Sequence, residues 1–499
     1  MKYKLDYKIS KQVGLPQEEH FQIPPEISNI TIKYDIKPEC RFLIFLVLID
    51  PNKNIRFQKQ LSYNTESIAI TESSFTTTMG GIPGRIYEGD WILKVCLFSE
   101  YIEKVLGGED YRFSIEISDD PIIVSERVGG LLWANEKFEY TGYDYRKLYN
   151  AEEKWYKGDF HAHTRLSDGH DTIKEINRKA NIMNLDFYSA TEHNVMHTGW
   201  EETSLLIIPS VEVTTIFGHA NIFGMKKRFS KLDKVLSAST KEEMKLSLVE
   251  CIEEAKKENY IISINHPFLY IWKWLYTEMQ LKDIDCIEII NDPTYETDKK
   301  AKAKEANEKS IYLADLMVSD GYSVCAIGGS DSHNSIDEFY EGSKEPSIAG
   351  DPATYLYMDG LSADNVMNAL KKKRAYVCRH CEVKTDMEFG KELKEEENEI
   401  EYSIILKDCK DKPIVFYIKN GIKTIVKNMR YDGSRYEIHE IIKLEKKDYN
   451  WVRFGAETES GEFIFYGNAM VKGSKKHSFN SFGDVSKYIS KSFKNKCYK

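Results

Sequence analysis

The chain has 499 residues, of which 41% are hydrophobic and 30% are charged, an ordinary globular balance that excludes a wholly disordered or fibrous protein. At about 150 residues per domain, this length predicts roughly three domains with sizeable cores. The 79 acidic side chains exceed the 69 basic ones, and the resulting net charge of −10 argues against strong general nucleic-acid binding, which needs a basic surface.

The first residues, MKYKLDYKISKQVGLPQEEH, contain neither an apolar core region nor a small-residue cleavage site, so we expect no secretory signal. The longest apolar run, residues 42–49, is far shorter than the roughly 20 residues that span a membrane, and it predicts a core strand. Nine cysteines scattered from Cys40 to Cys497 predict reduced thiols. Together these features predict a cytoplasmic protein with no membrane partner.

The first segment, residues 1–150, contains short β-type runs separated by turn signals such as Asp50-Pro51-Asn52. The runs cover residues 27–34, 41–49, 91–98 and 111–117. Repeated short strands with polar turns predict an N-terminal β-rich module that resembles a β-sandwich. No acids, histidines or cysteines cluster in this stretch of sequence, so we expect a structural or recognition role for it.

Strand-like and helical runs alternate in the second segment, residues 155–378. Strands are expected at residues 157–163, 186–190, 205–209, 260–265, 286–291 and 323–328. Helices are expected at residues 172–183, 241–258, 296–319 and 362–373. In the second of these helices, Met244, Leu248, Ile252 and Ala255 recur at helical spacing and predict a core-facing stripe. This alternation predicts an α/β barrel or a layered sheet.

The third segment, residues 380–475, returns to β character and predicts a C-terminal β-rich module. Its expected strands are residues 400–406, 414–418, 436–444, 452–457 and 463–466. Residues 476–499 form a basic tail, in which we expect a short helix with Val485, Tyr488, Ile489 and Phe493 on one face. The tail lysines are either solvated or available to attract an anionic substrate.

Histidines gather in the second segment, and the first two form an HxH pattern at the end of a strand-like run. Side chains two apart on a strand point to the same side, so His161 and His163 can meet one cation. Asp168 follows in a Ser-Asp-Gly loop that can bring a carboxylate to the same place. Histidine is the commonest metal ligand in proteins, and this pattern therefore predicts a metal site.

The same arrangement recurs after four later strand-like runs, each of which delivers a His, Asp or Glu near its carboxyl end. That edge is where active sites are built in α/β barrels. Together with the HxH region, the candidate ligands are six imidazoles and three carboxylates: His161, His163, Asp168, His193, Glu212, His219, His266, Asp331 and His333. They exceed the four donors that zinc usually takes, so we expect two or three divalent transition metals. Mixed nitrogen and oxygen donors suit manganese, zinc or iron.

These motifs resemble those of the polymerase and histidinol phosphatase (PHP) family: HxH, Asp-Gly, T-[DE]-H, a central Glu, His-Pro and SDxH in this order. The stretches WYKGDFHAHTRLSDG, ATEHN, PSVEVTT, FGHANIFG, NHPF, IEIIND and GGSDSH are most similar to its carbaryl-hydrolase branch, CehA/McbA. The resemblance covers residues 155–378 and implies a distorted seven-stranded (β/α) barrel between β-rich modules. It further implies that Glu212 bridges the metals, that Glu192 orients a ligand, and that Glu288 and Asn291 lie at or behind the pocket.

A hydroxide that bridges two cations can attack a phosphorus or carbonyl centre, so the expected activity is hydrolysis. The leading expectation is a phosphoesterase that cleaves a small phosphate ester or short nucleotide. A carboxyl-ester or carbamate hydrolase and a non-catalytic metal-binding scaffold are the alternatives. His219, His197 or His333 would protonate the leaving group. Arg165 would grip a phosphate, unless it is simply a surface arginine.

One cysteine motif lies at the start of the third segment. Cys378-Arg379-His380-Cys381 is a CxxC pattern with no second pair nearby, and Cys409 is the only other thiol close in sequence. We expect ordinary strand residues, with zinc binding or redox chemistry as the less favoured reading.

Overall fold

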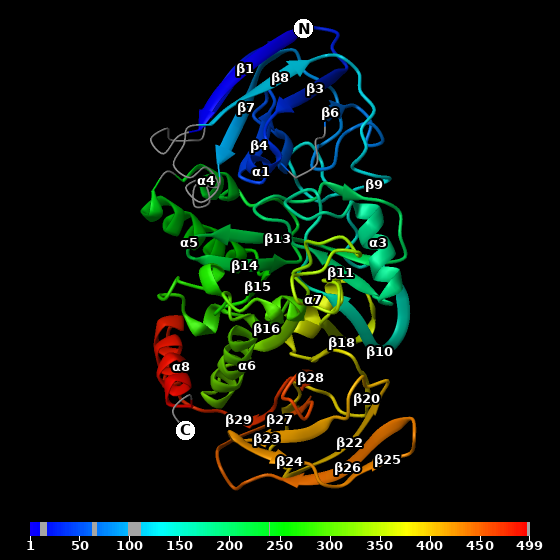
Figure 1. Ribbon diagram of the computed structural model, residues 1–499, viewed down its shortest axis with the longest axis vertical. Helices are drawn as coiled ribbons and strands as arrows, with labels where there is room; N and C mark the ends of the chain where they lie inside the picture. The colour runs from blue at the N-terminus through cyan, green and yellow to red at the C-terminus, as the bar shows by residue number, and fades with distance from the viewer. Residues whose placement is uncertain (10–16, 62–66, 98–110, 239, 497–499) are drawn as a thin grey trace.

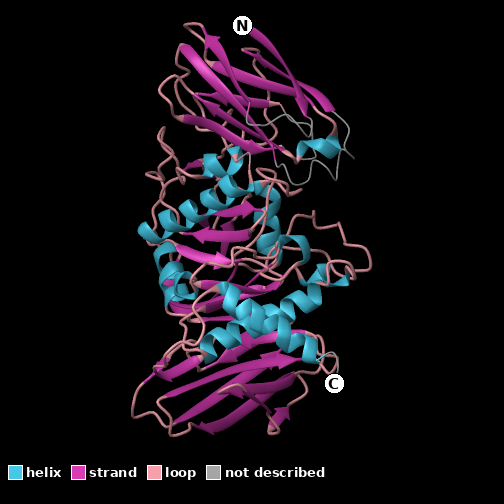
Figure 2. Ribbon diagram, turned by 90° about the vertical axis from the view of Figure 1, so that its left-hand side faces the viewer, coloured by secondary structure: helices cyan, strands magenta, loops and turns pink. Residues whose placement is uncertain are grey.

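The computed structural model describes residues 1–9, 17–61, 67–97, 111–238 and 240–496, which form three tiers along the long axis of the molecule (Figure 1). Strands make up the two end tiers, while strands and most of the helices share the middle one (Figure 2). The chain is thus a mixed α/β protein with flanking β-sheet modules. None of the helices among these residues combines the length and the apolar character that crossing a bilayer requires.

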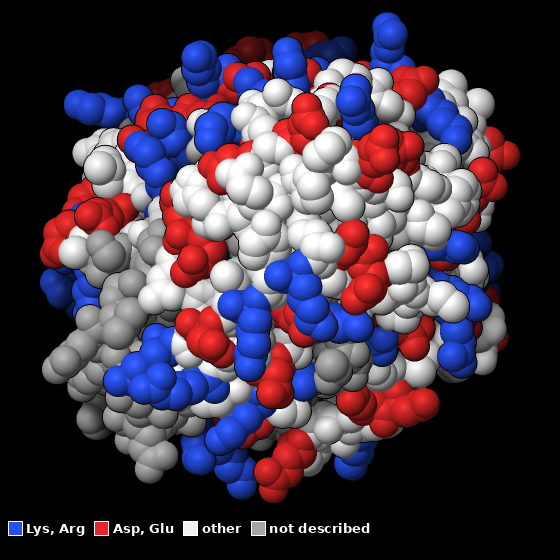
Figure 3. All heavy atoms as spheres, turned by 90° about the horizontal axis from the view of Figure 1, so that it is seen from above, with Lys and Arg blue, Asp and Glu red and all other residues white. Residues whose placement is uncertain are grey.

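The N-terminal tier consists of two four-stranded sheets that share one hydrophobic core. One sheet has the order β1 (Lys2–Ile9), β8 (Tyr111–Ser118), β3 (Asn29–Asp35) and β6 (Ile68–Thr71). The other has the order β2 (Gln17–Ile23), β7 (Gly89–Leu97), β4 (Ile44–Ile49) and β5 (Ile55–Gln60). The expected strand at 41–49 starts late because α1 (Pro38–Arg41) precedes it, and residue 98 lies outside the described residues. Basic and acidic side chains are interspersed on this end of the molecule (Figure 3).

A curved sheet forms the middle tier. Its strands, in spatial order, are β17 (Cys325–Gly329), β16 (Cys286–Asn291), β15 (Ile261–Ile264), β14 (Gly218–Phe223), β13 (Leu206–Thr215), β11 (Phe187–Ala190), β10 (Asn150–Asp159), β18 (Ala353–Leu361) and β19 (Ala375–Cys378). Strands β10, β11 and β13 are parallel neighbours, as are β15, β16 and β17. Parallel strands place their carboxyl ends at one edge, which is where the candidate ligands gather.

The strand pairing does not confirm the seven-stranded barrel that the PHP resemblance implies. The antiparallel strand β18 occupies the side of β10 that would otherwise pair with β17. Just beyond the ends of β10 and β17, Ala162 and Ser332 form a parallel bridge, and the Ser330 N–H donates to Asp159 Oδ1 at 3.2 Å. Beyond β19 the same sheet continues into the C-terminal tier through β28 (Phe463–Gly467), β27 (Tyr449–Glu457), β23 (Ile414–Lys419) and β24 (Ile422–Ile425).

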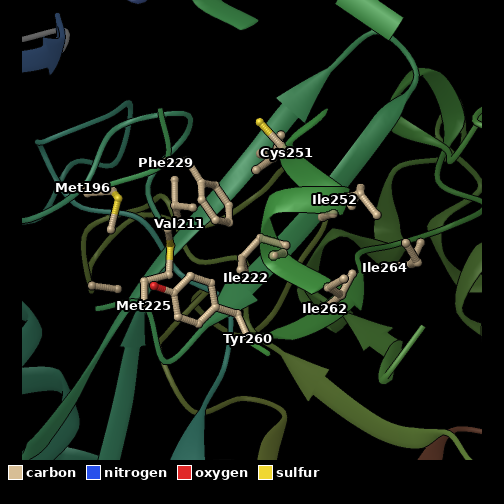
Figure 4. Close-up of a cluster of buried hydrophobic side chains, with 14 of the residues drawn as sticks. Met196, Val211, Ile222, Met225, Phe229, Cys251, Ile252, Tyr260, Ile262 and Ile264 are labelled. Carbon is tan, nitrogen blue, oxygen red and sulfur yellow. The ribbon is translucent and has the colours of Figure 1, made fainter. Parts of the chain in front are cut away.

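Helices cover this sheet: α3 (Ile173–Ile182), α4 (Leu232–Ser237), α5 (Lys241–Lys257), α6 (Ala303–Ser319) and α7 (Ala363–Lys371). Thr172 and Glu175 form a reciprocal capping box that starts α3. Helix α6 begins seven residues later than expected because the short 3-10 helix η3 (Pro293–Thr297) precedes it. In α5, Cys251 and Ile252 pack towards Ile222 and Ile262 of the sheet (Figure 4). Of the predicted stripe, Leu248, Ile252 and Ala255 are buried, whereas Met244 is only partly buried.

Short pieces complete the middle tier. Strands β9 (Leu131–Leu132) and β12 (Gly199–Trp200) pair with each other, so the N-terminal segment is tied to the chain after β11. The 3-10 turns η1 (Tyr270–Trp272) and η2 (Leu281–Asp283) lie between β15 and β16.

The C-terminal tier adds a second sheet in the order β20 (Glu382–Thr385), β22 (Glu399–Lys407), β26 (Arg435–Lys443) and β25 (Met429–Tyr431). Strands β21 (Glu392–Leu393) and β29 (Met470–Gly473) pair at the edge of the large sheet. Helix α8 (Phe482–Lys496) then packs back against α6. Val485 and Ile489 are buried as expected, whereas Tyr488 is 45% exposed.

A buried ion pair joins the C-terminal tier to the middle one. Arg453 of β27 donates to Asp315 of α6, with 2.7 Å between Nη2 and Oδ2, and Arg453 is only 4% exposed. The hydroxyl of Tyr466 also donates to Asp315 at 3.0 Å.

We predict that Arg453→Ala lowers the free energy of unfolding by about 3–5 kcal/mol, because it leaves the Asp315 carboxylate with an uncompensated charge at the interface. Denaturant-induced unfolding measures the change. Lys447→Ala, which removes an exposed partner of Glu445, is the control and should change stability by less than about 1 kcal/mol. Equal effects of the two substitutions would contradict the prediction.

Candidate metal centre

The carboxyl edge of the curved sheet gathers all nine side chains predicted from the sequence. His161 and His163 follow β10, and His193 follows β11. Glu212 and His219 face each other across the β13–β14 hairpin, with 3.2 Å between His219 Nδ1 and Glu212 Oε1. The remaining four come from the loop after His163 and from the ends of β15 and β17: Asp168, His266, Asp331 and His333.

The donor atoms form overlapping groups, within each of which they lie within 4.8 Å of one another. One group contains His163, Asp168, His193 and His333. The others are His161, His163 and Glu212; His193, Glu212 and His219; and His161, His266 and Glu288. Asp331 joins them, because its Oδ1 lies 3.2 Å from His161 Nε2 and 3.1 Å from His163 Nε2. Shared members make these groups one continuous centre.

Glu212 is the most enclosed carboxylate of the centre, with no exposed surface. Burial acts to raise its pKa, but the imidazoles of His161, His219 and His193 outweigh burial and hold the pKa well below its ordinary value. The pKa of His161 responds in the opposite sense: burial lowers it, but Asp331, Glu288 and Glu212 outweigh burial and raise it well above the usual range. The negative charge on Glu212 and the positive charge on the surrounding imidazoles therefore stabilise each other.

The chemistry of the donor set fits divalent cations. Three buried atoms that face the centre contact ionisable side chains at 3.2–3.3 Å but make no hydrogen bond among the described residues: His161 Nε2, Asp168 Oδ1 and His219 Nδ1. An unpaired buried polar atom is costly, and a bound cation would satisfy such an atom. Imidazole and carboxylate donors without thiolates suit zinc, iron or manganese.

Residues behind the donors hold them in place, as ligand-orienting residues commonly do in metal sites. Glu288 Oε1 lies 2.9 Å from His161 Nδ1, and Glu288 Oε2 accepts a hydrogen bond from the backbone N–H of His266 at 2.8 Å. Asn291 donates to Asp331 at 3.1 Å. Asn265, which the sequence did not single out, donates to Glu212 Oε1 at 2.8 Å. In the sequence, only the position of Asn265 directly before His266 could have indicated that it lies at the site.

Glu192 organises the loop that carries Asp168. Its carboxylate accepts from the hydroxyls of Thr164 and Ser167 at 2.6 and 2.5 Å, and it lies 2.8 Å from His197 Nε2. Burial acts to raise the pKa of Glu192, but His197 and these hydrogen bonds lower it to about 2. These hydrogen bonds hold the loop of Asp168, and the orienting role that the resemblance implies stays a prediction.

Two of the four residues predicted to act on substrate lie away from the open cleft. His197 is 2% exposed and faces Glu192, and it is not among the residues that line the cleft. The Arg165 guanidinium donates to Glu126 at 2.7 Å and to the His170 carbonyl at 2.8 Å, and it does not line the cleft either. His219 and His333 do line it. The placement of Arg165 follows from Glu126, 39 residues earlier in the chain, and that of His197 follows from its neighbour Glu192.

The cleft over the donors has a volume of about 310 Å³. One wall is aromatic and apolar: Leu269, Trp272, Tyr295 and Tyr340. The ring centroids of Trp272 and Tyr295 are 6.4 Å apart, and those of Tyr295 and Tyr340 are 5.0 Å apart. Among the described residues that line the cleft there is no lysine or arginine. The aromatic run FLYIWKWLY after His266 was the missed signal for this wall.

No family model and no curated protein matches the chain. Among solved structures, a two-domain protein containing a predicted PHP-like metal-dependent phosphoesterase from Bacteroides vulgatus is 16% identical, with 66% of this chain and 99% of that chain covered and a TM-score of 0.34. A proposed metal-dependent phosphoesterase from Bifidobacterium adolescentis is 14% identical, with 42% and 94% covered and a TM-score of 0.27. An amidohydrolase from Chromobacterium violaceum is 13% identical, with 36% and 89% covered and a TM-score of 0.24. These likenesses are distant, so the function rests on the site's own side chains.

We predict that the purified protein, reconstituted with manganese, zinc or iron, holds at least two metal ions per chain, because the donor groups are too many and too extended for one ion. The double substitution His161→Ala, His163→Ala should remove most of that metal, as measured by elemental analysis after desalting.

His170→Ala is the matched control, since His170 lies two residues beyond Asp168 but pairs with Glu338 on the surface. It should leave the metal content unchanged. Less than one metal ion per chain after reconstitution with all three metals would rule out a centre with several ions.

Proposed function

We propose that the chain is a metal-dependent hydrolase of the PHP type, related to its CehA/McbA branch. The observation that carries this proposal is the convergence of six imidazoles and three carboxylates at the floor of an open cleft, where several buried donor atoms make no hydrogen bond among the described residues. A purely structural role for so many ionisable side chains would require each to be compensated by a protein partner. The open cleft makes a non-catalytic scaffold the weaker alternative.

Two or three divalent cations would be held by the nine predicted ligands, with Glu212 central to the set. When bound, such cations acidify water and stabilise negative charge that develops on a substrate oxygen. The chain's own residues supply the rest: Glu288 and Asn291 orient the donors, and Glu192 fixes the loop of Asp168. His219 and His333 line the cleft and are the remaining candidates among the residues predicted to pass a proton to the leaving group.

The proposed substrate is a small phosphate ester. A volume of about 310 Å³ lies at the lower end of the range of small-molecule sites, which favours a compact substrate over a polymer. Phosphoryl transfer spreads charge over several oxygens, and a centre of several cations matches that better than the single oxyanion of acyl transfer. In the absence of lining lysine or arginine side chains, the cations themselves would carry the recognition of phosphate.

One observation favours the second candidate, a carboxyl-ester or carbamate hydrolase on the same centre. The wall formed by Trp272, Tyr295 and Tyr340 offers ring faces but no cationic side chain to a bound molecule. A neutral ester or carbamate with a flat leaving group suits such a wall. The two candidates therefore differ in the charge of the substrate and share the metal chemistry.

We predict that p-nitrophenyl phosphate or bis(p-nitrophenyl) phosphate is hydrolysed faster than p-nitrophenyl acetate or an aryl carbamate by one metal-loaded preparation. Release of p-nitrophenol measures the nitrophenyl substrates, and chromatography of the released phenol measures the carbamate, with chelator-treated protein as the blank. Asp331→Asn should remove most of the activity and leave the circular dichroism spectrum unchanged. Faster carbamate or acetate hydrolysis would reverse the ranking, and activity that resists the chelator would contradict the proposal.

We also predict that Trp272→Ala raises KM for aryl substrates about tenfold with a smaller change in kcat, because it removes a ring from the wall and leaves the metal donors intact. Tyr270→Ala is the control, since Tyr270 lies beside Trp272 but does not line the cleft and is 50% exposed. Steady-state kinetics of both variants compare the two effects. An equal change in both variants would show that the wall does not contact substrate.

A further inference from the structure

Two thiols meet at the junction between the middle and C-terminal tiers. Cys381 directly precedes β20, and Cys409 lies two residues beyond the end of β22. Their sulfur atoms are 2.8 Å apart, and both side chains are partly exposed. The proximity was not visible in the sequence, where the CxxC motif points to Cys378 as the partner of Cys381.

The main chain holds the two cysteines together from both sides. Strands β20 and β22 pair from Glu382 opposite Lys407 onwards. On the other side of the thiols, the Lys410 N–H donates to the His380 carbonyl at 3.2 Å. The contact between the sulfurs is therefore a consequence of backbone pairing and not of side-chain rotamers alone.

The thiols of this junction do not form a metal site in the described structure. A structural zinc ion takes four converging donors. Among the described residues, no cysteine belongs to a group of three or more His, Cys, Asp or Glu donors that lie within 4.8 Å of one another. Cys378 instead donates its S–H to the Cys381 carbonyl at 3.0 Å. The arrangement thus favours chemistry between two thiols.

We propose that Cys381 and Cys409 are a reversible disulfide site that is oxidised by a low-molecular-weight disulfide. The thiolate of one cysteine attacks the small disulfide, which forms a mixed disulfide and releases one small thiol. The second cysteine then attacks the protein sulfur of the mixed disulfide and releases the other small thiol. The two protein S–H protons end on the two released thiols, and two electrons pass from the protein to the small molecule.

The surroundings of the pair set how fast this reaction runs. Contact with Cys378 and burial raise the pKa of Cys381 above its ordinary value, although contact with Cys409 opposes the shift. Contact with Cys381 and burial raise the pKa of Cys409. Because the thiolate is the attacking species, oxidation is slow at neutral pH and accelerates as the pH rises towards 9.

A disulfide between Cys381 and Cys409 would stabilise the contacts of Glu345, which lies in a segment that also lines the cleft. Glu345 lies between His333 and β18, in the same segment as Tyr340 of the aromatic wall. Its carboxylate pairs with Arg379 at 2.8 Å, with His380 at 3.0 Å and with Lys410. His380 directly precedes Cys381 and Lys410 directly follows Cys409, so a disulfide would link the two chain segments that hold Glu345.

A second close pair of thiols provides an internal comparison. Cys286 and Cys325 lie opposite each other on the parallel strands β16 and β17, and neither has exposed surface. A small disulfide cannot reach them in the folded protein. If Cys381 and Cys409 are oxidised and Cys286 and Cys325 are not, access of the small disulfide decides which thiols react, because both pairs are close.

The test treats the folded full-length protein with oxidised glutathione at pH 8, blocks free thiols with an alkylating reagent under denaturing conditions, and maps peptides by mass spectrometry. We expect a peptide pair joined through Cys381 and Cys409, with Cys286 and Cys325 alkylated. Oxidation should raise the Tm by several degrees because it constrains the unfolded chain, and dithiothreitol should reverse the rise.

Three variants make the test specific. Cys378→Ser should retain the linkage, while Cys409→Ser should abolish it and leave Cys381 as a glutathione adduct. Cys381→Ser should also abolish it, and circular dichroism checks that each variant is folded. A linkage mainly between Cys378 and Cys381, no linkage in the wild-type protein, or equal oxidation of Cys286 and Cys325 would overturn the proposal. None of these readouts depends on hydrolase activity.

Discussion

The burial of many ionisable side chains at one edge of a sheet is the constraint on which the rest of this structure depends. Glu212 has no exposed surface, and it stays ionised only because imidazoles surround it. The same carboxylate, with Asp331 and Glu288, keeps the pKa of His161 high. A low-dielectric site makes each of these interactions strong and each missing partner costly. A cation at this place would relieve both problems, which is why the donor set points to metal chemistry.

The surrounding fold can be understood as the support for that edge. The parallel neighbours β10, β11 and β13, and β15, β16 and β17, bring their carboxyl ends together, while the β13–β14 hairpin sets Glu212 beside His219. Glu192 then fixes the loop that carries Asp168 through hydroxyl donors. The donors thus rest on strands and on buried hydrogen bonds, which gives the precise placement that a catalytic centre needs.

The C-terminal tier belongs to the same physical unit as the sheet that carries the centre. Strand β19 pairs with β28, so one sheet runs from the donor-bearing strands into the third segment. The buried pair of Arg453 and Asp315 joins this tier to α6. Glu345, in the same segment as Tyr340, pairs with the side chains of Arg379 and Lys410, which lie near Cys381 and Cys409. A change in the C-terminal tier therefore has direct contacts through which it can reach the cleft.

The sequence by itself determined the nine candidate donors and most of the helices and strands, because each follows from a local pattern. Helical spacing predicted α5, and the strand ends predicted where His161, His193 and Asp331 gather. Only the tertiary structure decided that β18 pairs with β10, that Arg165 faces Glu126, and that Trp272 and Tyr340 share one wall. It likewise brought Cys381 to Cys409, whereas the CxxC motif points to Cys378. Periodicity and motif spacing act over a few residues, whereas these pairings join residues tens to hundreds of positions apart, and only the packed chain specifies them.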